Sequence, residues 1–417
     1  MKINKSAGLW IITERAIRLL SGIFLFAAIA RHLGPQNFGN LSVTLGILAI
    51  LAALPNMGAD NINISEIKKQ NYSNVLIGSA ILVRLALCIP AIAAAIIISL
   101  GNSEISPLII ASSTLIPIAA INIINHTLLA HGNFKSYAKY GCIALTLGAT
   151  LKIYGIISGK PTLYFSIIIP LESLTITTLS LKKIGGFKLL IECIKTAKKT
   201  SAINYAKLCK PTAVSAILVG IYLKIELILI GYWLGGEAAG KWAIVVLCIT
   251  PWTLLSAATL PILNSKLAGI PTDSIPYQNV LTRFIQANMI AGALSIPFNY
   301  LFYKYIISNI MGNEFRDLEN LIAIASISII PILLGAIQEV SIAHRRTTYI
   351  VLKKAIIGIP FSIISLKLMT SHFGLEGAAI SLTASYFFTA VLLNIFFDKH
   401  FHSALLNSLN SSNSIRR

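Results

Sequence analysis

RHLGPQNFG, residues 31–39, is followed later in the chain by a similar stretch, YWLGGEAAG, residues 232–240. Three positions repeat at a constant offset of 201 residues: Leu33, Gly34 and Gly39 match Leu234, Gly235 and Gly240. Each stretch joins two long apolar runs, where glycine allows a tight helix exit and lets the next helix pack closely. Leu-Gly-x4-Gly is a common helix-turn pattern, but two copies in matching positions predict an internal duplication.

The composition around these stretches is that of a chain whose solvent is lipid. Of the 417 residues, 55% are hydrophobic and 12% are charged, and the mean hydropathy is +0.77. Soluble proteins carry about 25% charged residues, so this chain has too little polar surface to cover a water-facing globule. We therefore expect a polytopic membrane protein.

Apolar windows long enough to cross a bilayer run through the whole chain. A spanning helix needs about 20 mostly apolar residues, and such runs must be helical because their backbone N–H groups have no water to bond. They are too continuous for barrel strands, which need about ten alternating residues. Twelve windows meet this criterion: residues 8–30, 40–64, 74–99, 107–129, 140–158, 162–181, 211–233, 240–263, 280–301, 320–343, 350–371 and 374–397.

The distribution of positive charge predicts the orientation of these windows. A formal net charge of +19 can indicate nucleic-acid binding, but membrane topology gives a better account. With the N-terminus inside, and with Lys241, Lys353, Lys354 and Lys367 counted with the loops beside them, 22 of the 34 Lys and Arg residues fall on the inner side, 6 on the outer side and 6 within the helices. Because Lys and Arg gather in cytoplasmic loops, we expect both termini in the cytoplasm and no nucleic-acid partner.

The longest and most basic connection, residues 182–210, divides the windows into two sets of six and carries eight Lys residues. From Gly186 its apolar residues recur at roughly helical spacing, which predicts either an amphipathic helix on the anionic inner leaflet or a plain cytosolic linker. The expected domains are an N-terminal lobe at 1–181, this connection, a C-terminal lobe at 211–397, and a cytoplasmic tail at 398–417 that is disordered from His400.

The two sets both begin on the inner side, so they are predicted to be parallel repeats related by an axis along the membrane normal. A weaker echo supports the repeat: Ala130-His131 ends the fourth window and Ala343-His344 ends the tenth. The expected fold class is therefore an all-α integral membrane protein, with twelve transmembrane helices in two six-helix lobes around a central cavity.

Charged residues inside the windows are the candidate functional site. A charge at the bilayer centre costs roughly 2.5–3.5 kcal/mol on insertion scales, so each one requires a reason. Glu14 can pair with Arg18 one turn later, yet cations outnumber acids in the helices of the first lobe. A pyrophosphate would fit that surplus, because Arg binds phosphate oxygens bidentately and Lys binds them as a point charge. The alternative is internal ion pairing that holds the helices in register.

Two sets of residues follow from this interpretation. The candidates for binding a pyrophosphate are Arg15, Arg18, Arg84 and Lys152. The candidates for lining the cavity or coupling an ion are Glu14, Glu172, Lys224, Glu226 and Arg283. Among these, Glu14 and Glu226 are considered for coupling to H⁺ or Na⁺.

Several classes of function lack their motifs in this sequence. There is no Walker motif for ATP hydrolysis, and no His or Cys cluster has the spacing of a metal site. The outer loops leave little room for a catalytic domain, and the five scattered cysteines are interpreted as small apolar fillers. We therefore expect no cofactor, no metal and no enzymatic activity.

Residues 30–67, ARHLGPQNFGNLSVTLGILAILAALPNMGADNINISEI, resemble the start of a polysaccharide flippase. The family is that of the Wzx-type O-antigen transporters, within the multidrug/oligosaccharidyl-lipid/polysaccharide exporter superfamily. The resemblance continues as the twelve-helix layout and recurs at residues 222–242, YLKIELILIGYWLGGEAAGKW. The sequence departs from the family pattern at Glu226, where an Asp is frequent, and at His32, where a Tyr is frequent.

The resemblance implies transport of an undecaprenyl-pyrophosphate-linked oligosaccharide, such as an O-antigen repeat unit for lipopolysaccharide, across the bacterial inner membrane. It implies alternating access by rocking of the lobes, with membrane lipids and other polysaccharide-assembly proteins as partners. Two alternatives stay open. A multidrug cation exporter of the same superfamily should have an acidic cavity, and an integral-membrane glycan-assembly enzyme, such as a polymerase, should lengthen glycans unaided.

Overall fold

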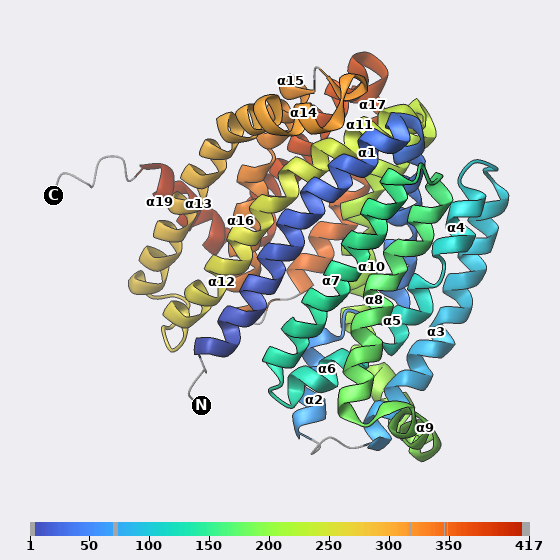
Figure 1. Cartoon of the computed structure of the whole chain (residues 1–417). Coiled ribbons are helices and arrows are strands. Elements are labelled where there is room, and N and C mark those ends of the chain that lie inside the picture. The colour runs from blue at the N-terminus through green and yellow to red at the C-terminus, as the bar shows by residue number, and fades with distance from the viewer. Residues whose placement is uncertain (1–4, 70–73, 317, 346, 348, 411–417) are drawn as a thin grey trace. The chain divides into compact units, whose positions relative to one another are not determined.

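The computed structural model describes residues 5–69, 74–316, 318–345, 347 and 349–410 (Figure 1). Within the helices, the side chains of residues 5–12, 15, 61, 254, 257, 258, 261 and 410 lie outside this description. Every regular element in the described ranges is an α-helix, a 3-10 helix or a π-helix. The predicted all-α fold class is confirmed.

The described chain packs as two compact units. The first contains the residues up to Gly231 together with Gly235–Gly240, and the second contains Tyr232–Leu234 and the residues from Lys241 onward. The seam between the units therefore falls within the second copy of the repeated stretch. The lobe boundaries expected from the sequence lie instead in the basic connection at 182–210, and they stay a prediction.

The first unit is built from long helices joined by short turns. Its helices are α1 (Lys5–Asn56), α2 (Asp60–Lys69), α3 (Asn74–Leu100), α4 (Ser106–Ser112), α5 (Leu115–Ile121), α6 (Ile123–Ala130), α7 (Phe134–Ile157), α8 (Thr162–Ile184), α9 (Gly186–Thr196) and most of α10 (Lys199–Leu234). The helix α10 begins well before the predicted window at 211–233, because the basic stretch that precedes the apolar run continues the same helix.

Glycines of the repeated stretch break the backbone where the two windows of each pair meet. Within α1, Gly34 has φ 71° and ψ 167° and divides two helical segments. At the end of α10, Gly235 has nearly the same conformation, with φ 90° and ψ 172°. Side chains with a Cβ rarely adopt a positive φ, so both copies of the Leu-Gly pair need their glycine for the same turn.

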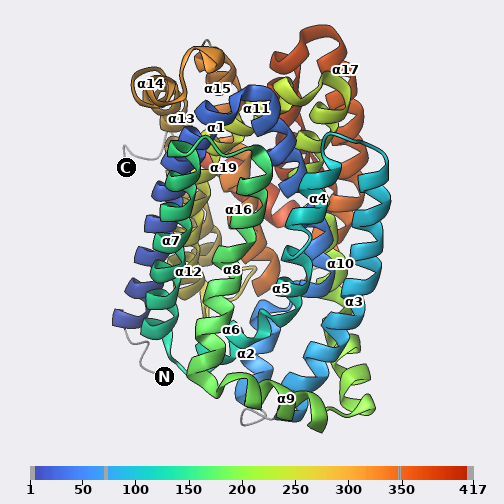
Figure 2. The ribbon, with the colours of Figure 1, turned by 45° about the vertical axis from the view of Figure 1, so that its right-hand side comes forward.

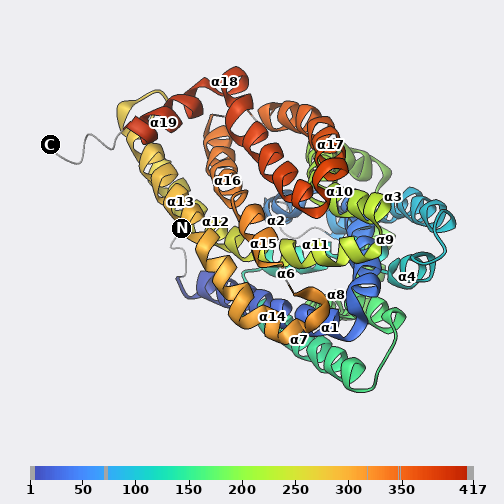
Figure 3. The ribbon, with the colours of Figure 1, turned by 90° about the horizontal axis from the view of Figure 1, so that it is seen from above.

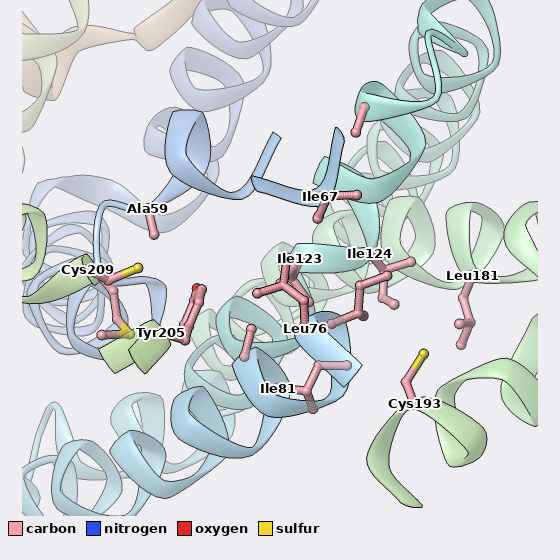
Figure 4. Close-up of a cluster of buried hydrophobic side chains, with 14 residues drawn as sticks. Ala59, Ile67, Leu76, Ile81, Ile123, Ile124, Leu181, Cys193, Tyr205 and Cys209 are labelled. Carbon is pink, nitrogen blue, oxygen red and sulfur yellow. The ribbon is translucent and has the colours of Figure 1, made fainter. Parts of the chain in front are cut away.

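A cluster of buried apolar side chains fills the first unit beside α3 (Figure 4). Cys193 of α9 and Leu181 lie at one edge of it, and Tyr205 and Cys209 of α10 lie at the other. The backbone carbonyl of Cys193 contacts Gly78 of α3 so closely that no side chain would fit there. Burial raises the pKa of the Cys193 thiol, which fits the interpretation of the cysteines as apolar fillers; all five are free thiols.

The helices of the second unit are interrupted by 3-10 and π-helical segments. It holds the later part of α11 (Gly236–Ile249), the 3-10 turn η1 (Thr250–Trp252), α12 (Thr253–Leu267), α13 (Ile275–Phe302), the π-helix η2 (Tyr303–Ile307), α14 (Ser308–Met311), η3 (Asn313–Phe315), α15 (Glu319–Ser326), α16 (Ile329–His344), α17 (Tyr349–Phe387), the π-helix η4 (Phe388–Leu392), α18 (Leu393–Phe397) and α19 (Lys399–Asn410). Within α17, Gly374 has φ 55° and separates the last two predicted windows.

The prediction that the chain is disordered from His400 onward is wrong for the residues up to Asn410. Residues Lys399–Asn410 form α19, which packs against α13 within the second unit (Figure 3). Phe401, Ala404 and Leu405 are buried there with Tyr277 and Leu281 of α13. Their spacing of three and four residues places them on one face of the helix, which offsets the polar character of the rest of the segment.

Eight helices among the described residues are long and apolar enough to cross a membrane. They are Ala16–Asn56, Asn74–Leu100, Ser106–Ala130, Phe134–Ile157, Thr162–Ile184, Lys199–Leu234, Glu319–His344 and Tyr349–Phe397. The first and last each contain two predicted windows around a glycine break. The windows at 240–263 and 280–301 correspond to α11–α12 and α13 and are outside this set, so the total of twelve spans stays a prediction.

Candidate functional site

An acid–base cluster lies where α1, α7 and α8 pack together in the first unit (Figure 2). Arg18 of α1 donates from Nε and Nη2 to Glu14 Oε1, at 2.9 Å and 2.6 Å. Its Nη1 lies 3.7 Å from Oε2 of Glu172 on α8. The other oxygen of Glu172 accepts from Lys152 Nζ of α7 at 2.5 Å. The pairing of Glu14 with Arg18 predicted from their spacing is confirmed.

Glycines on α7 make room for the two carboxylates. A Cβ on Gly141 would lie 2.7 Å from Glu14 Oε1, and a Cβ on Gly148 would clash with Oε1 of Glu172. Residues seven apart lie on nearly the same face of a helix, and Lys152 follows Gly148 by one more turn. The sequence of α7 therefore presents two small gaps and one cation along a single face.

Burial within the cluster is uneven. The side chains of Glu14, Lys152 and Glu172 are 7%, 6% and 15% exposed, whereas that of Arg18 is 35% exposed. Lys152 Nζ also lies 5.6 Å from the centre of the Phe26 ring, a cation–π distance. The four described charges balance one another, and Arg18 is the member of the cluster with the most exposed side chain.

Arg84 of α3 occupies a different environment in the same unit. It is fully buried, and its Nη2 donates to the backbone carbonyl of Asn56 at 2.7 Å. Its Nε donates to the hydroxyl of Tyr205 at 3.3 Å, and its Nη1 lies 3.5 Å from the Ala119 carbonyl. The Asn56 carbonyl is at the C-terminal end of α1, beyond the last intrahelical bond, and it also accepts from the Ala59 N–H at 3.3 Å. Arg84 thus supplies a donor to a helix end.

Sequence reasoning missed a chain of buried polar groups that starts at Arg84. Tyr205 donates to Asn63 Oδ1 at 2.9 Å, Asn63 Nδ2 lies 3.0 Å from Nδ1 of His126, and His126 Nε2 lies 3.3 Å from Asp60 Oδ1. His126 and Asn63 are buried. A histidine and two asparagines in the run INIINHTLLA are polar residues in an expected span, and that signal could have identified the site.

The remaining predicted site residues lie in several places. Lys224 is half-buried and Glu226 is buried on α10, in the part that belongs to the first unit. Arg283 is exposed on α13 of the second unit. The side chain of Arg15 is outside the described residues. The structure therefore brings Arg18 and Lys152 together with Glu14 and Glu172, and it places Arg84 in a separate network.

The second unit has a polar network of its own at the end of α16. Asp398 Oδ2 accepts from Arg345 Nη2 at 2.6 Å and from Gln338 Nε2 at 3.0 Å, and Oδ1 accepts from the Phe401 N–H at 3.1 Å. Burial by itself would raise the pKa of Asp398, but the hydrogen bonds from Arg345, Gln338 and Phe401 outweigh it and lower the pKa. Arg345 and Asp398 also line a cavity of about 590 Å³.

Comparison with known proteins gives both a family and a fold. Residues 28–319 match the sequence model of the family described as "Polysaccharide biosynthesis protein". The search of curated proteins found no match. Among solved structures, an inward-facing multidrug resistance MATE family transporter of the MOP superfamily is similar, with a TM-score of 0.68 and 16% identity over 95% of this chain and 98% of that one.

Two further structures have the same fold. The lipid II flippase MurJ, in an inward closed conformation, gives a TM-score of 0.65 and 16% identity over 98% of this chain and 92% of that one. An outward-facing MATE family transporter gives 0.59 and 15% identity, with 95% of each chain covered. The shared fold and the eight long apolar helices identify a multi-pass membrane protein.

Proposed function

This chain belongs to the family of polysaccharide biosynthesis proteins, and from that membership we propose that it is a lipid-linked oligosaccharide flippase. The substrate is an undecaprenyl-pyrophosphate-linked oligosaccharide, moved from the inner to the outer leaflet of the bacterial inner membrane by alternating access. The fold shared with MurJ and the MATE transporters supports transport as the activity. Both termini lie in the cytoplasm in this proposal.

The observation that carries the proposal is the partly exposed side chain of Arg18 beside the buried side chains of Glu14 and Lys152. Two of its nitrogens are engaged by Glu14, but Nη1 is 3.7 Å from Glu172, which is beyond hydrogen-bond length. That nitrogen is available to a phosphate oxygen, and Arg binds such oxygens strongly because its N–H groups match their geometry. Arg15 follows Glu14 directly and would be the second cation at the headgroup.

The other predicted cations take different parts in this mechanism. Lys152 is held by Glu172 and would contribute its charge as the pyrophosphate draws Glu172 and Arg18 apart. Arg84 has no exposed surface, so we assign it to positioning the end of α1 and not to the headgroup. Lys224, Glu226 and Arg283 stay proposed for the polar lining through which the sugars pass.

Transport in proteoliposomes tests the proposal directly. We expect the purified full chain to move an undecaprenyl-pyrophosphate-linked oligosaccharide between leaflets, and Arg18→Ala to lower the rate about tenfold or more. Loss of one charge-assisted hydrogen bond, worth roughly 1.5–3 kcal/mol, predicts that size of effect. Lys69→Ala is the matched control, because Lys69 is 71% exposed and pairs with Glu66 at the surface, where such a pair contributes little.

Three outcomes would overturn the proposal. Export of a cationic dye without movement of the lipid-linked oligosaccharide would identify a multidrug exporter. Lengthening of the glycan by the purified protein would identify an assembly enzyme. Equal rates for wild type and Arg18→Ala would remove the cluster from the transport path. In cells, deletion should abolish surface polysaccharide and leave lipid-linked repeat units inside.

A further inference from the structure

Five polar side chains form one continuous network in the first unit, made of three hydrogen bonds and one contact between a histidine and an aspartate. The chain runs from Arg84 of α3 to Tyr205 of α10, Asn63 of α2, His126 of α6 and Asp60 at the start of α2. Its first four members are buried, and the Asp60 side chain is 56% exposed. The chain therefore connects a fully enclosed cation to a carboxylate that solvent reaches.

The donor direction along this chain is determined by Arg84. A guanidinium has only N–H donors, so the Tyr205 oxygen must accept from Arg84 Nε. The Tyr205 hydroxyl proton then points to Asn63, which must offer Oδ1 as the acceptor. Asn63 Nδ2 is left facing His126 Nδ1 as a donor.

One protonation state of His126 satisfies this arrangement. Nδ1 must be unprotonated to accept from Asn63, and Nε2 then carries the hydrogen that points to Asp60 Oδ1. A neutral imidazole has one donor and one acceptor nitrogen, so the chain requires the neutral Nε2–H form. A second proton, on Nδ1, would place the N–H of His126 against the amide N–H of Asn63. It would therefore require the Asn63 amide to rotate by half a turn, so that Oδ1 faces His126.

Turning the Asn63 amide changes every bond behind it. Its Oδ1 would accept from the new Nδ1–H of His126, and its Nδ2 would donate to the Tyr205 oxygen. That oxygen would then accept from both Asn63 and Arg84, so its own hydrogen would leave the chain for another acceptor. Protonation at His126 thus alters how Tyr205 is held.

We propose that His126, with Asp60 as its route to solvent, is a proton-binding site that couples proton movement to transport. The site joins α2, α3, α6 and α10, and through the Asn56 carbonyl it also holds the end of α1. Proton binding would loosen Tyr205 near the start of α10, the helix whose last residues, Tyr232–Leu234, belong to the second unit. The coupling rests on the proposed flippase function, whereas the proton site itself does not.

The charged groups that act on His126 are members of the same polar network. Asp60 comes from α2 and Arg84 from α3, and they act on the imidazole with opposite sign; Tyr205 of α10 is the further ionisable group. The helices α7 and α8 also pack on α6, and in the described residues neither places a charged group in hydrogen-bond or ion-pair contact with His126. Asp60 is therefore the acid that would stabilise an imidazolium.

The proton site can be tested without any transport assay. In the full protein with ¹⁵N-labelled histidine, NMR distinguishes the nitrogen that carries hydrogen, and His126→Gln identifies the signals. We expect the Nε2–H form at high pH and a doubly protonated ring after acidification. The Nδ1–H form at high pH, or no change on acidification, would overturn the inference.

Two substitutions test the role of the amide, with one control. Asn63→Asp replaces the donor that faces Nδ1 with an acceptor, so His126 should stay doubly protonated at a pH where the wild-type ring is neutral. Tyr205→Phe frees the Asn63 amide to turn, so protonation should also become easier if Asn63→Asp fails to fold. His131→Gln is the control, because His131 is exposed and bonds the Thr127 carbonyl of its own helix; the His126 titration should be unchanged. Identical titrations in all the variants would sink the proposal.

A transport assay distinguishes failure of the proton coupling from failure of the proposed flippase function. In proteoliposomes with a pH gradient, wild-type flipping of the lipid-linked oligosaccharide should depend on the gradient, and His126→Gln should lose that dependence. Retained gradient dependence in His126→Gln would overturn the coupling. If no lipid-linked oligosaccharide moves in any variant, the proposed function fails, and the NMR titration still decides whether His126 binds the proton.

Discussion

Gly39 of α1 and Gly240 of α11 lie against each other's turns with no room for a side chain on either. A Cβ on Gly39 would clash with the Gly236 carbonyl oxygen and lie 2.6 Å from the Gly240 nitrogen, and a Cβ on Gly240 would clash with the Pro35 carbonyl oxygen. All four residues belong to the first unit. The two copies of the repeated stretch therefore contact each other, and each supplies the small residue that the other requires.

This contact predicts that Gly39→Ala and Gly240→Ala destabilise the protein. The obstructing atoms belong to the backbone and cannot move aside as a side chain would, so we expect each variant to lose at least about 1–3 kcal/mol, the usual cost of overpacking. Thermal unfolding in detergent measures the loss. Gly22→Ala is the control, because nothing lies within 4 Å of a Cβ there, and it should unfold like the wild type.

A methyl group at Gly148 should disturb the acid–base cluster. It would clash with the Glu172 carboxylate and push it away from Lys152, so we expect Gly148→Ala to lower transport several-fold more than it lowers expression. Gly46→Ala is a matched variant, because its Cβ would meet Leu227 and Ile228 at 3.7 Å, an ordinary contact distance. Equal transport by the two variants would show that the position of Glu172 does not matter.

Replacing one member of the Lys152–Glu172 ion pair should destabilise the protein more than replacing both members. Glu172→Gln leaves a buried ammonium without its nearest counter-charge, and breaking a buried pair in this way costs about 3–5 kcal/mol. Replacing both residues by Met should recover most of the stability, because a buried pair and a well-packed apolar pair are often of similar stability. A double-mutant cycle in detergent unfolding measures the coupling, and additive losses would contradict the pairing.

Asp398 should make stability depend on pH at the acidic end. Its pKa in the folded protein lies below its usual value because of the bonds from Arg345 and Gln338. Its contribution is therefore complete above the unfolded pKa of about 3.9 and is lost as the pH falls through the folded value. We expect Asp398→Asn to lower the melting temperature at neutral pH and to converge with the wild type in acid. Asp273→Asn, at a side chain 81% exposed, should show neither effect.

Much of the fold could be predicted from residue patterns that act locally. Long apolar runs specify helices in lipid because the backbone must bond within each segment, and Gly34 marks a break because its φ is positive. The helix α19 was missed because Phe401, Ala404 and Leu405 form an apolar face too short to stand out in a polar segment. Its stability depends on packing against α13, which the order of residues along the chain does not reveal.

The candidate site was predictable only where its members are neighbours in sequence. Glu14 and Arg18 are one helical turn apart, so their pairing could be predicted. Arg84 and His126 lie 28 to 121 residues along the chain from their partners, and only the packed helices show that they meet. Counting charges indicated a surplus of cations, whereas the structure shows Arg84 satisfied by neutral oxygens.

The position of the seam at residues 231–241 bears on how the polypeptide could be divided. A gene truncated between α8 and α10 would encode all of α1–α8 but omit the hydroxyl of Tyr205, which lies between Arg84 and Asn63. It would also omit the second glycine turn, against which Gly39 packs. A fragment that continues through Gly240 would keep both of these contacts, and it would include both copies of the repeated stretch.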